Sequence, residues 1–203
     1  MSHRFTLQAV RAECIQEQAL EWGKDEMRML AFAVSRKGQF FSTGLRGIGS
    51  YGTGDVRTDD PFPMQLIEAV LEDDGLEVLL FVWLVEEDGG GVRQSFAGLE
   101  NEFRSRFRSE VEQLAGLGFP RDCIPFTAFF KSALTFTPSL EEAGRSGRDD
   151  KVFAPFEIIL DKPPQNLGFD AVSKEFLLIR AKNVGTYLLT FRFRYEPIPI
   201  IVT

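Results

Sequence analysis

The carboxyl-terminal part of the chain alternates between apolar and polar positions. From residue 186 to residue 195, large apolar side chains take every second place: Tyr187, Leu189, Phe191, Phe193 and Tyr195. The places between them include Arg192 and Arg194. A period of two is typical of a strand with one buried face. Asn183-Val184-Gly185 comes directly before it, so the pattern predicts a hairpin with a second strand over Glu175–Ala181.

Five further stretches have the pattern of strands. Phe5–Ile15, Met27–Val34 and Phe153–Leu160 are apolar runs bounded by polar segments. Leu76–Val85 is almost continuously apolar, which is typical of a strand covered on both faces. Phe62–Leu71 fits both a strand and a helical face, and we favour a strand. Six to eight strands separated by turn-rich segments predict a mainly β protein, an antiparallel Greek-key β-sandwich.

The segment from Ser95 to Leu117 has a different period. Its apolar residues recur at spacings of three and four: Phe96, Leu99, Phe103, Phe107, Val111 and Leu114. Glutamates and arginines fill the remaining places, so the segment is expected to be an amphipathic helix. Ser95 is suited to cap its first turn, and Gly116 or Gly118 is suited to end it.

The predicted helix belongs to a longer insertion. It is followed by the aromatic-rich stretch Phe126–Phe136, by Pro138 and by a polar stretch, Glu141–Arg148, that we expect to be a loop. We expect residues 89–148 to form a helical insertion between two strands of a single domain that spans residues 1–203. Its phenylalanine stripe should pack on the sandwich. The alternative is a surface that docks on a protein partner, and the mixed charges make membrane contact the less favoured possibility.

Residues 38–60 are rich in glycine, and we expect them to form a flexible loop. They include Gly47-Ile-Gly-Ser-Tyr-Gly52, which matches the Gly-x-Gly-x-x-Gly pattern of dinucleotide-binding proteins. That pattern has meaning between a strand and a helix of a crossover unit, and no such unit surrounds it here. A loop is therefore preferred to a dinucleotide cradle.

Composition excludes several classes of function. The 203 residues carry a net charge of −7, and such a surface repels phosphate backbones, so nucleic acid is not an expected partner. The only histidine is His3, and the only cysteines are Cys14 and Cys123. A zinc site or a catalytic centre built on histidine is therefore not expected. A chain of this length can bury a core without disulfides or a metal.

The amino terminus, Met-Ser-His-Arg-Phe-Thr, is not a basic segment followed by an apolar one, as an export signal would be. No run approaches the roughly 18 apolar residues that span a bilayer. We therefore expect a soluble, cytoplasmic protein, although leaderless export would leave no readable trace.

Acidic residues gather where predicted strands begin or end. Glu86-Glu87-Asp88 ends the apolar strand that contains Trp83, and Asp149-Asp150 comes shortly before the strand at Phe153. If these two strands are antiparallel neighbours, the two groups converge. Crowded carboxylates repel one another, and a hard dication with six to eight oxygen ligands relieves that repulsion.

These segments resemble the calcium- and phospholipid-binding β-sandwich module of synaptotagmin and protein kinase C. Gly23-Lys-Asp-Glu-Met27 is similar to its Gly-x-x-Asp-Pro-Tyr segment. Trp83-Leu-Val-Glu-Glu-Asp88 resembles the Trp-containing strand that ends in Asp-x-Asp, and Asp149-Asp150 resembles the acidic pair of the next strand. The resemblance implies a set of calcium ligands: Asp25, Glu86, Asp88, Asp149 and Asp150.

We therefore expect a non-enzymatic binding or assembly module, calcium-dependent through the acidic end of the sandwich. Its insertion or glycine-rich segment would contact a protein partner or another copy of the chain. One alternative is a structural subunit of a larger assembly that binds no metal. Another is a glycoside-active enzyme that uses paired carboxylates such as Glu86 and Asp149. Only Trp22 and Trp83 are available to line a sugar-binding cleft, which disfavours the enzyme.

Overall fold

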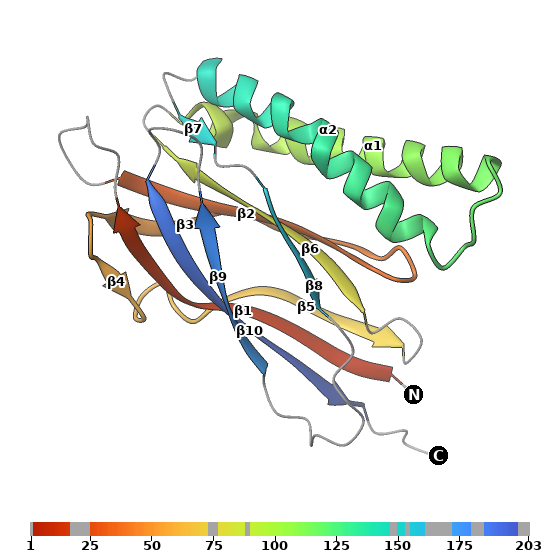
Figure 1. Cartoon of the computed structure of the whole chain (residues 1–203), viewed down its shortest axis with the longest axis horizontal. Helices are drawn as coiled ribbons and strands as arrows, with labels where there is room; N and C mark the ends of the chain where they lie inside the picture. Colours follow the sequence, from red (N-terminus) through yellow and green to blue (C-terminus); the bar gives the residue numbers. More distant parts are fainter. Residues whose placement is uncertain are drawn as a thin grey trace.

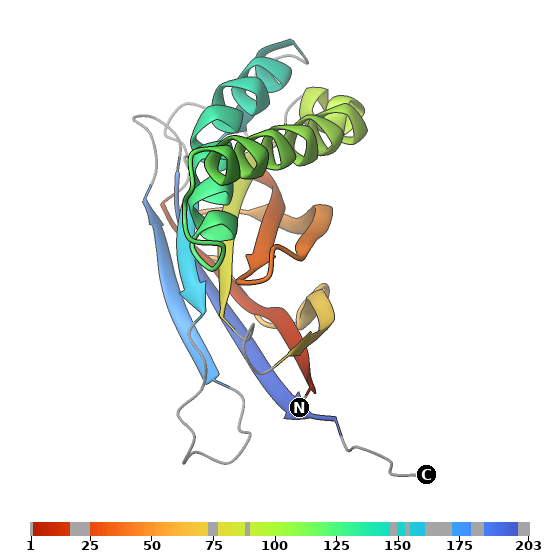
Figure 2. The same ribbon diagram turned by 90° about the vertical axis from the view of Figure 1, so that its right-hand side faces the viewer.

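Two antiparallel β-sheets pack face to face, and two long helices cover the outer face of one of them (Figure 1). A computed structural model describes residues 2–16, 25–72, 77–87, 90–146, 150–152, 155–160, 172–179 and 185–198. Figure 2 shows the three layers from the side, with both helices above the sheet that contains β2 and β6. The predicted β-sandwich with a helical insertion is confirmed.

The first sheet is built around the long strands β1 (Ser2–Gln16) and β10 (Thr186–Pro197), which pair along almost their whole length. β9 (Val172–Ile179) lies on the other side of β10. β4 (Val56–Arg57) and β5 (Met64–Glu72) both pair with the free side of β1. The strands β1, β5, β9 and β10 had been expected from the apolar pattern.

The second sheet has β2 (Asp25–Ser35) and β6 (Val78–Glu86) at its centre. β3 (Phe40–Tyr51) pairs with β2, and β7 (Lys151–Val152) and β8 (Phe156–Leu160) both pair with β6. The two helices, α1 (Gly91–Gly116) and α2 (Ile124–Ser146), come between β6 and β7 in the chain.

Strand β6 is buried on both of its faces, as its unbroken apolar run predicts. One set of alternating side chains packs in the core between the two sheets: Val78, Leu80, Val82 and Leu84. The other set packs under the helices: Leu79, Phe81, Trp83 and Val85. A strand with two buried faces needs a covering layer on each, and the helices provide the second one.

Interlocking aromatic rings fill the space between the second sheet and the helices. Phe103 of α1 lies 4.4 Å from Phe32 of β2, 5.3 Å from Phe129 and 5.1 Å from Phe136, measured between ring centroids. Trp83 contacts the same cluster, and its Nε1–H donates to Thr137 Oγ1 at 3.2 Å. Close, tilted ring pairs of this kind stabilise beyond the apolar area they bury. The phenylalanine stripe of α1 is therefore a core surface.

The flexible loop expected at residues 38–60 is wrong, because most of it is strand β3. β3 pairs with β2 through two register shifts, and Gly44 and Gly49 adopt positive φ values of 68° and 116° near them. Glycine is suited to such bulges since it has no Cβ. Burial raises the pKa of Tyr51, at the end of β3, to about 12, and its hydroxyl donates to the carbonyl of Ile48.

The helices are longer than the sequence predicts. α1 begins at Gly91 rather than after Ser95, and α2 continues through Pro138 to Ser146 where a loop was expected. A proline inside a helix costs about 3 kcal/mol. Burial of Phe136 and Leu140 on either side of it favours continuing the helix. The end of α1 is as predicted, since Gly118 has a φ of 77° and its N–H donates to the carbonyl of Ala115.

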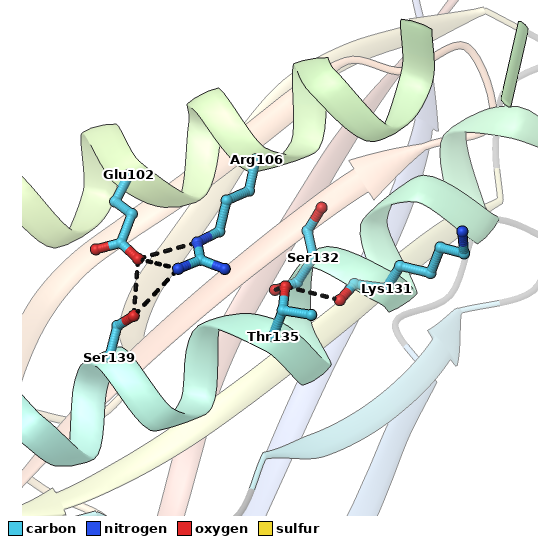
Figure 3. Close-up of polar contacts among 6 residues, drawn as sticks. All are labelled: Glu102, Arg106, Lys131, Ser132, Thr135 and Ser139. Carbon is cyan, nitrogen blue, oxygen red and sulfur yellow. Dashed lines mark hydrogen bonds and ion pairs between the residues drawn. The ribbon is translucent and has the colours of Figure 1, made fainter. Parts of the chain in front are cut away.

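A polar contact, which we call the helix clamp, joins the two helices (Figure 3). The clamp consists of Glu102, Arg106 and Ser139. Ser139 Oγ donates to Glu102 Oε1 at 2.7 Å, and Arg106 donates to the same oxygen from the same helix at 2.6 Å. Lys131 of α2 also lies 3.3 Å from the carboxylate of Glu110 of α1. The helices are thus fixed to each other as well as to the sheet.

Replacing Phe103 by alanine should lower the free energy of unfolding by about 3–5 kcal/mol, because the cavity would open between the sheet and both helices. Urea denaturation measures this value. Leu117→Ala is the control, since Leu117 is 74% exposed and its truncation should change the free energy by less than about 0.5 kcal/mol. Equal effects of the two substitutions would contradict a role for the aromatic layer as core.

Candidate functional site

The end of β6 and the start of β7 lie side by side, as the acidic pattern requires. Val85 pairs with Val152, and Glu86 pairs with Lys151. The last turn of α2 is also close, because a Cβ on Gly144 would stand only 2.6 Å from the carbonyl oxygen of Asp150. We call this region the acidic tip and define it by Glu86, Glu87 and Asp150.

Asp150 is 4% exposed, and its carboxylate lies at the amino terminus of α1. Its two oxygens accept hydrogen bonds from the N–H groups of Gly90 at 3.1 Å and Val92 at 3.0 Å. The first N–H groups of a helix lack partners within the helix, and a negative charge is stabilised beside them. Asp150 therefore does what the sequence assigned to Ser95, from 58 residues away in the chain.

The two glutamates of the acidic tip contact cations of the same chain. Glu86 is 1% exposed, and Lys151 Nζ lies 3.1 Å from its carboxylate. Glu87 lies between two arginines: Arg28 donates to one oxygen, and Arg93 Nε is 3.1 Å from the other. These contacts join β2, β6, β7 and the first turn of α1 at one point.

The described residues of the acidic tip do not by themselves make a calcium site. Glu86 and Asp150 already contact an ammonium group and two amide N–H groups, which a cation would have to replace. The side chain of Asp25, and all of Asp88 and Asp149, lie outside the described residues. Within the described part, no three acidic, histidine or cysteine side chains gather as metal ligands would. The five-residue calcium site stays a prediction.

A cavity of about 690 Å³ lies at the other end of the helical layer. The carboxyl-terminal half of α1, the β2–β3 turn and the first turn of α2 enclose it. In Figure 1 this turn and the α1–α2 connection lie at the same end of the molecule, away from β7. The residues that line it are Lys37, Gly38, Phe40, Arg104, Phe107, Arg108, Val111, Glu112, Ala115, Arg121, Ile124 and Pro125.

The inner wall of this cavity is apolar. Phe107 and Ile124 are buried, and Phe40 and Val111 are half-buried. The β2–β3 turn closes one side, and Gly38 has a φ of 79° there, a conformation that glycine adopts without strain. A volume of this size falls within the range of small-molecule sites, roughly 300–1,000 Å³.

The rim of the cavity carries four cations and one carboxylate, Glu112. Arg104 pairs with Glu100 at 2.7 Å and lies 4.3 Å from the ring centroid of Phe40, and Lys37 pairs with Glu72 at 2.8 Å. Arg108 and Arg121 are different: no carboxylate of the described residues lies within ion-pair distance of either. Two uncompensated positive charges thus face one cavity of an acidic protein.

The sequence contained a signal for this cavity that its analysis missed. Arg104 and Arg106 each have a glutamate four residues before them and pair with it. Arg108 instead has Arg104 at that position, so two like charges lie one turn apart on the same face. Arg121 and the β2–β3 turn come from other parts of the chain, and only the tertiary structure brings them to α1.

No family model and no curated protein matches the chain in sequence. Two solved structures are similar in fold. The human GIVD cytosolic phospholipase A2, in complex with methyl gamma-linolenyl fluorophosphonate, aligns with a TM-score of 0.41 and 10% identity over 98% of this chain. The first C2-type domain of plant extended synaptotagmin 1 aligns with a TM-score of 0.42 and 8% identity over 97% of this chain and 96% of its own.

The chain spans 18% of the length of the phospholipase. The synaptotagmin-type domain belongs to the kind of module that the acidic segments resemble. A shared sandwich does not carry function with it, so function has to be inferred from the side chains of this chain. In the part of the chain that the structure describes, no helix is long and apolar enough to cross a membrane.

We predict that Asp150→Asn lowers the free energy of unfolding by about 1–3 kcal/mol, because a charged acceptor of two buried N–H groups is lost. The measurement is urea denaturation with a chelator present, so that no calcium contributes. Asp122→Asn is the matched control, since Asp122 is exposed in the α1–α2 connection. An Asp150 variant as stable as the control would mean that this carboxylate does not hold the helix.

The calcium prediction has a separate test. Calcium at 100 times its dissociation constant should stabilise the folded protein by about 2.7 kcal/mol, which a melting curve detects as a higher Tm. Asp149→Asn should remove that rise, and it is a cleaner variant than Asp150→Asn because Asp150 also holds α1. A Tm that is the same with calcium and with chelator would refute the calcium site.

Proposed function

We propose that this protein is a non-enzymatic binding module whose ligand site is the cavity between α1, the β2–β3 turn and the start of α2. The observation that supports this most directly is the combination of an apolar wall with two arginines that no described carboxylate neutralises. Removing an apolar group from water into such a site is favourable. The helix clamp and the aromatic layer hold two walls in place, which reduces the entropy lost on binding.

The side chains around the cavity favour binding over catalysis. Acid–base catalysis needs a positioned proton donor or acceptor, and covalent catalysis needs an activated nucleophile. The lining contains one carboxylate, Glu112, and no histidine, cysteine, serine or threonine.

The glycoside-active alternative receives little support from the acidic tip. Glu86 is buried and contacts Lys151, so its carboxylate does not face a space that could hold a sugar ring. A glycosidase needs two carboxyl groups on either side of the scissile bond. Its other proposed carboxylate, Asp149, lies outside the described residues.

A structural subunit of a larger assembly is the second candidate. Phe119, Phe130 and Leu134 are exposed on α2 and on the connection that precedes it. Large apolar side chains on a surface are common in interfaces, although single ones also occur on monomers. This candidate requires a stable oligomer, whereas a ligand-binding module can act as a monomer; light scattering distinguishes the two.

An uncharged fluorescent probe, N-phenyl-1-naphthylamine, tests the cavity as a binding site. We expect saturable, blue-shifted emission with the natural chain. Ala115→Trp should weaken probe binding at least tenfold, because the new side chain would fill the cavity. Gln113→Trp is the matched control, since Gln113 is exposed on the same helix but does not line the cavity.

Two results would contradict the proposal. One is the absence of saturable binding by the natural chain. The other is equal probe affinity in the Ala115 and Gln113 variants, which would place the probe elsewhere. Circular dichroism and the Tm of each variant confirm that it is folded before its affinity is compared.

A further inference from the structure

We infer that the ligand of this cavity is a free single-chain amphiphile with an anionic head, a carboxylate or a phosphate, and an alkyl tail. The inference rests on the proposed function and adds the chemical class of the ligand. Three features of the described residues support it: the charge of the rim, the geometry of the arginines, and the size of the apolar wall.

The rim is positive in a protein that is negative as a whole. Four of its side chains are cations and one is a carboxylate, whereas the chain has a net charge of −7. Arg108 lies one helical turn from Arg104, and Arg121 comes from the connection at the other wall. Like charges brought together raise the free energy of the empty site, and an anion between them lowers it.

The unpaired cations are arginines rather than lysines. A guanidinium presents parallel N–H donors that match a carboxylate or a phosphate through two hydrogen bonds. Arg104 uses its donors on Glu100, and Lys37 uses its ammonium on Glu72. The donors of Arg108 and Arg121 have no such partner among the described residues and are therefore the expected contacts of the anionic head.

The cavity is too large and too apolar for an inorganic anion alone. Its 690 Å³ corresponds to the volume of roughly twenty water molecules. Phe107, Val111 and Ile124 would then remain in contact with water. An alkyl tail attached to the anionic head covers these side chains, so the head and the tail each use a different part of the same site.

The surface around the rim favours a free molecule over a membrane lipid. An anionic bilayer would approach the whole helical face, which mixes glutamates with arginines, and would be repelled by the net negative charge of the protein. A single amphiphile contacts only the cavity and its rim, where positive charge exceeds negative charge.

Isothermal titration calorimetry with a series of ten-carbon ligands tests the head group, each ligand below its critical micelle concentration. Decanoate and decyl phosphate should bind at least tenfold more tightly than decanol or decyltrimethylammonium. Inorganic phosphate should show no measurable binding at the same concentrations. Lengthening the tail from octanoate to decanoate should increase the affinity about fourfold for each methylene.

Substitutions then locate the head group. Arg108→Gln and Arg121→Gln should each weaken decanoate binding at least tenfold and leave decanol binding unchanged. Arg192→Gln is the matched control, because Arg192 is also exposed and without a carboxylate partner in the described chain, but lies on β10 of the other sheet. The double variant Arg108→Glu, Arg121→Glu should prefer decyltrimethylammonium to decanoate.

Several outcomes would overturn the inference. Equal affinities for decanoate and decanol would show that the site does not select an anion, while probe binding would still support the cavity as a site. Binding to anionic vesicles or to an acidic peptide, without binding to decanoate, would assign the rim to a different partner. Failure of both the uncharged probe and the ligand series would refute the proposed function as well.

Discussion

Burial of strand β6 on both faces is the constraint around which this molecule is arranged. One face of the strand closes the core between the sheets, and the other needs a separate apolar cover. Helices α1 and α2 provide that cover through Phe103, Phe129 and Phe136. Because the helices are inserted between β6 and β7, the chain leaves the sheet, covers it and returns to pair with the same strand.

The two ends of the helical layer use charge in different ways. At the acidic tip, each described carboxylate contacts donors of the same chain, and Asp150 holds the start of α1 through two N–H groups. The acidic residues there join the insertion to the sandwich. At the other end, Arg108 and Arg121 face a cavity without a described carboxylate partner. Satisfied charges stabilise a fold, whereas unsatisfied charges beside an apolar cavity favour a ligand.

The same helix connects these two ends. α1 runs from Gly91 at the acidic tip to Gly116 beyond the cavity, a length of roughly 40 Å at 1.5 Å per residue. Its buried face belongs to the aromatic layer, and its other faces carry the helix clamp and the cationic rim. One amphipathic helix therefore has a structural role and a proposed binding role, on different faces of one rigid element.

Periodicity along the sequence was sufficient for most of the architecture. The alternation in β1 and β10, the unbroken apolar run of β6 and the phenylalanine stripe of α1 each report a buried face, and burial depends on local spacing. The same reasoning failed for β3, whose glycines form bulges rather than a loop, and for Pro138, where packing outweighed an unfavourable proline. It also placed Glu86 near the residues before Phe153, which β6 and β7 confirm.

The sites depended on tertiary structure. No local pattern shows that Asp150 would meet the first N–H groups of α1, or that Lys151 would lie beside Glu86. The cavity likewise combines a turn, the end of one helix and the start of another. Sequence alone determined which faces are apolar, since that is a property of neighbouring residues. Only the folded chain decided which charges are neutralised, because the partner of a charge is set by distance in space and not by order along the chain.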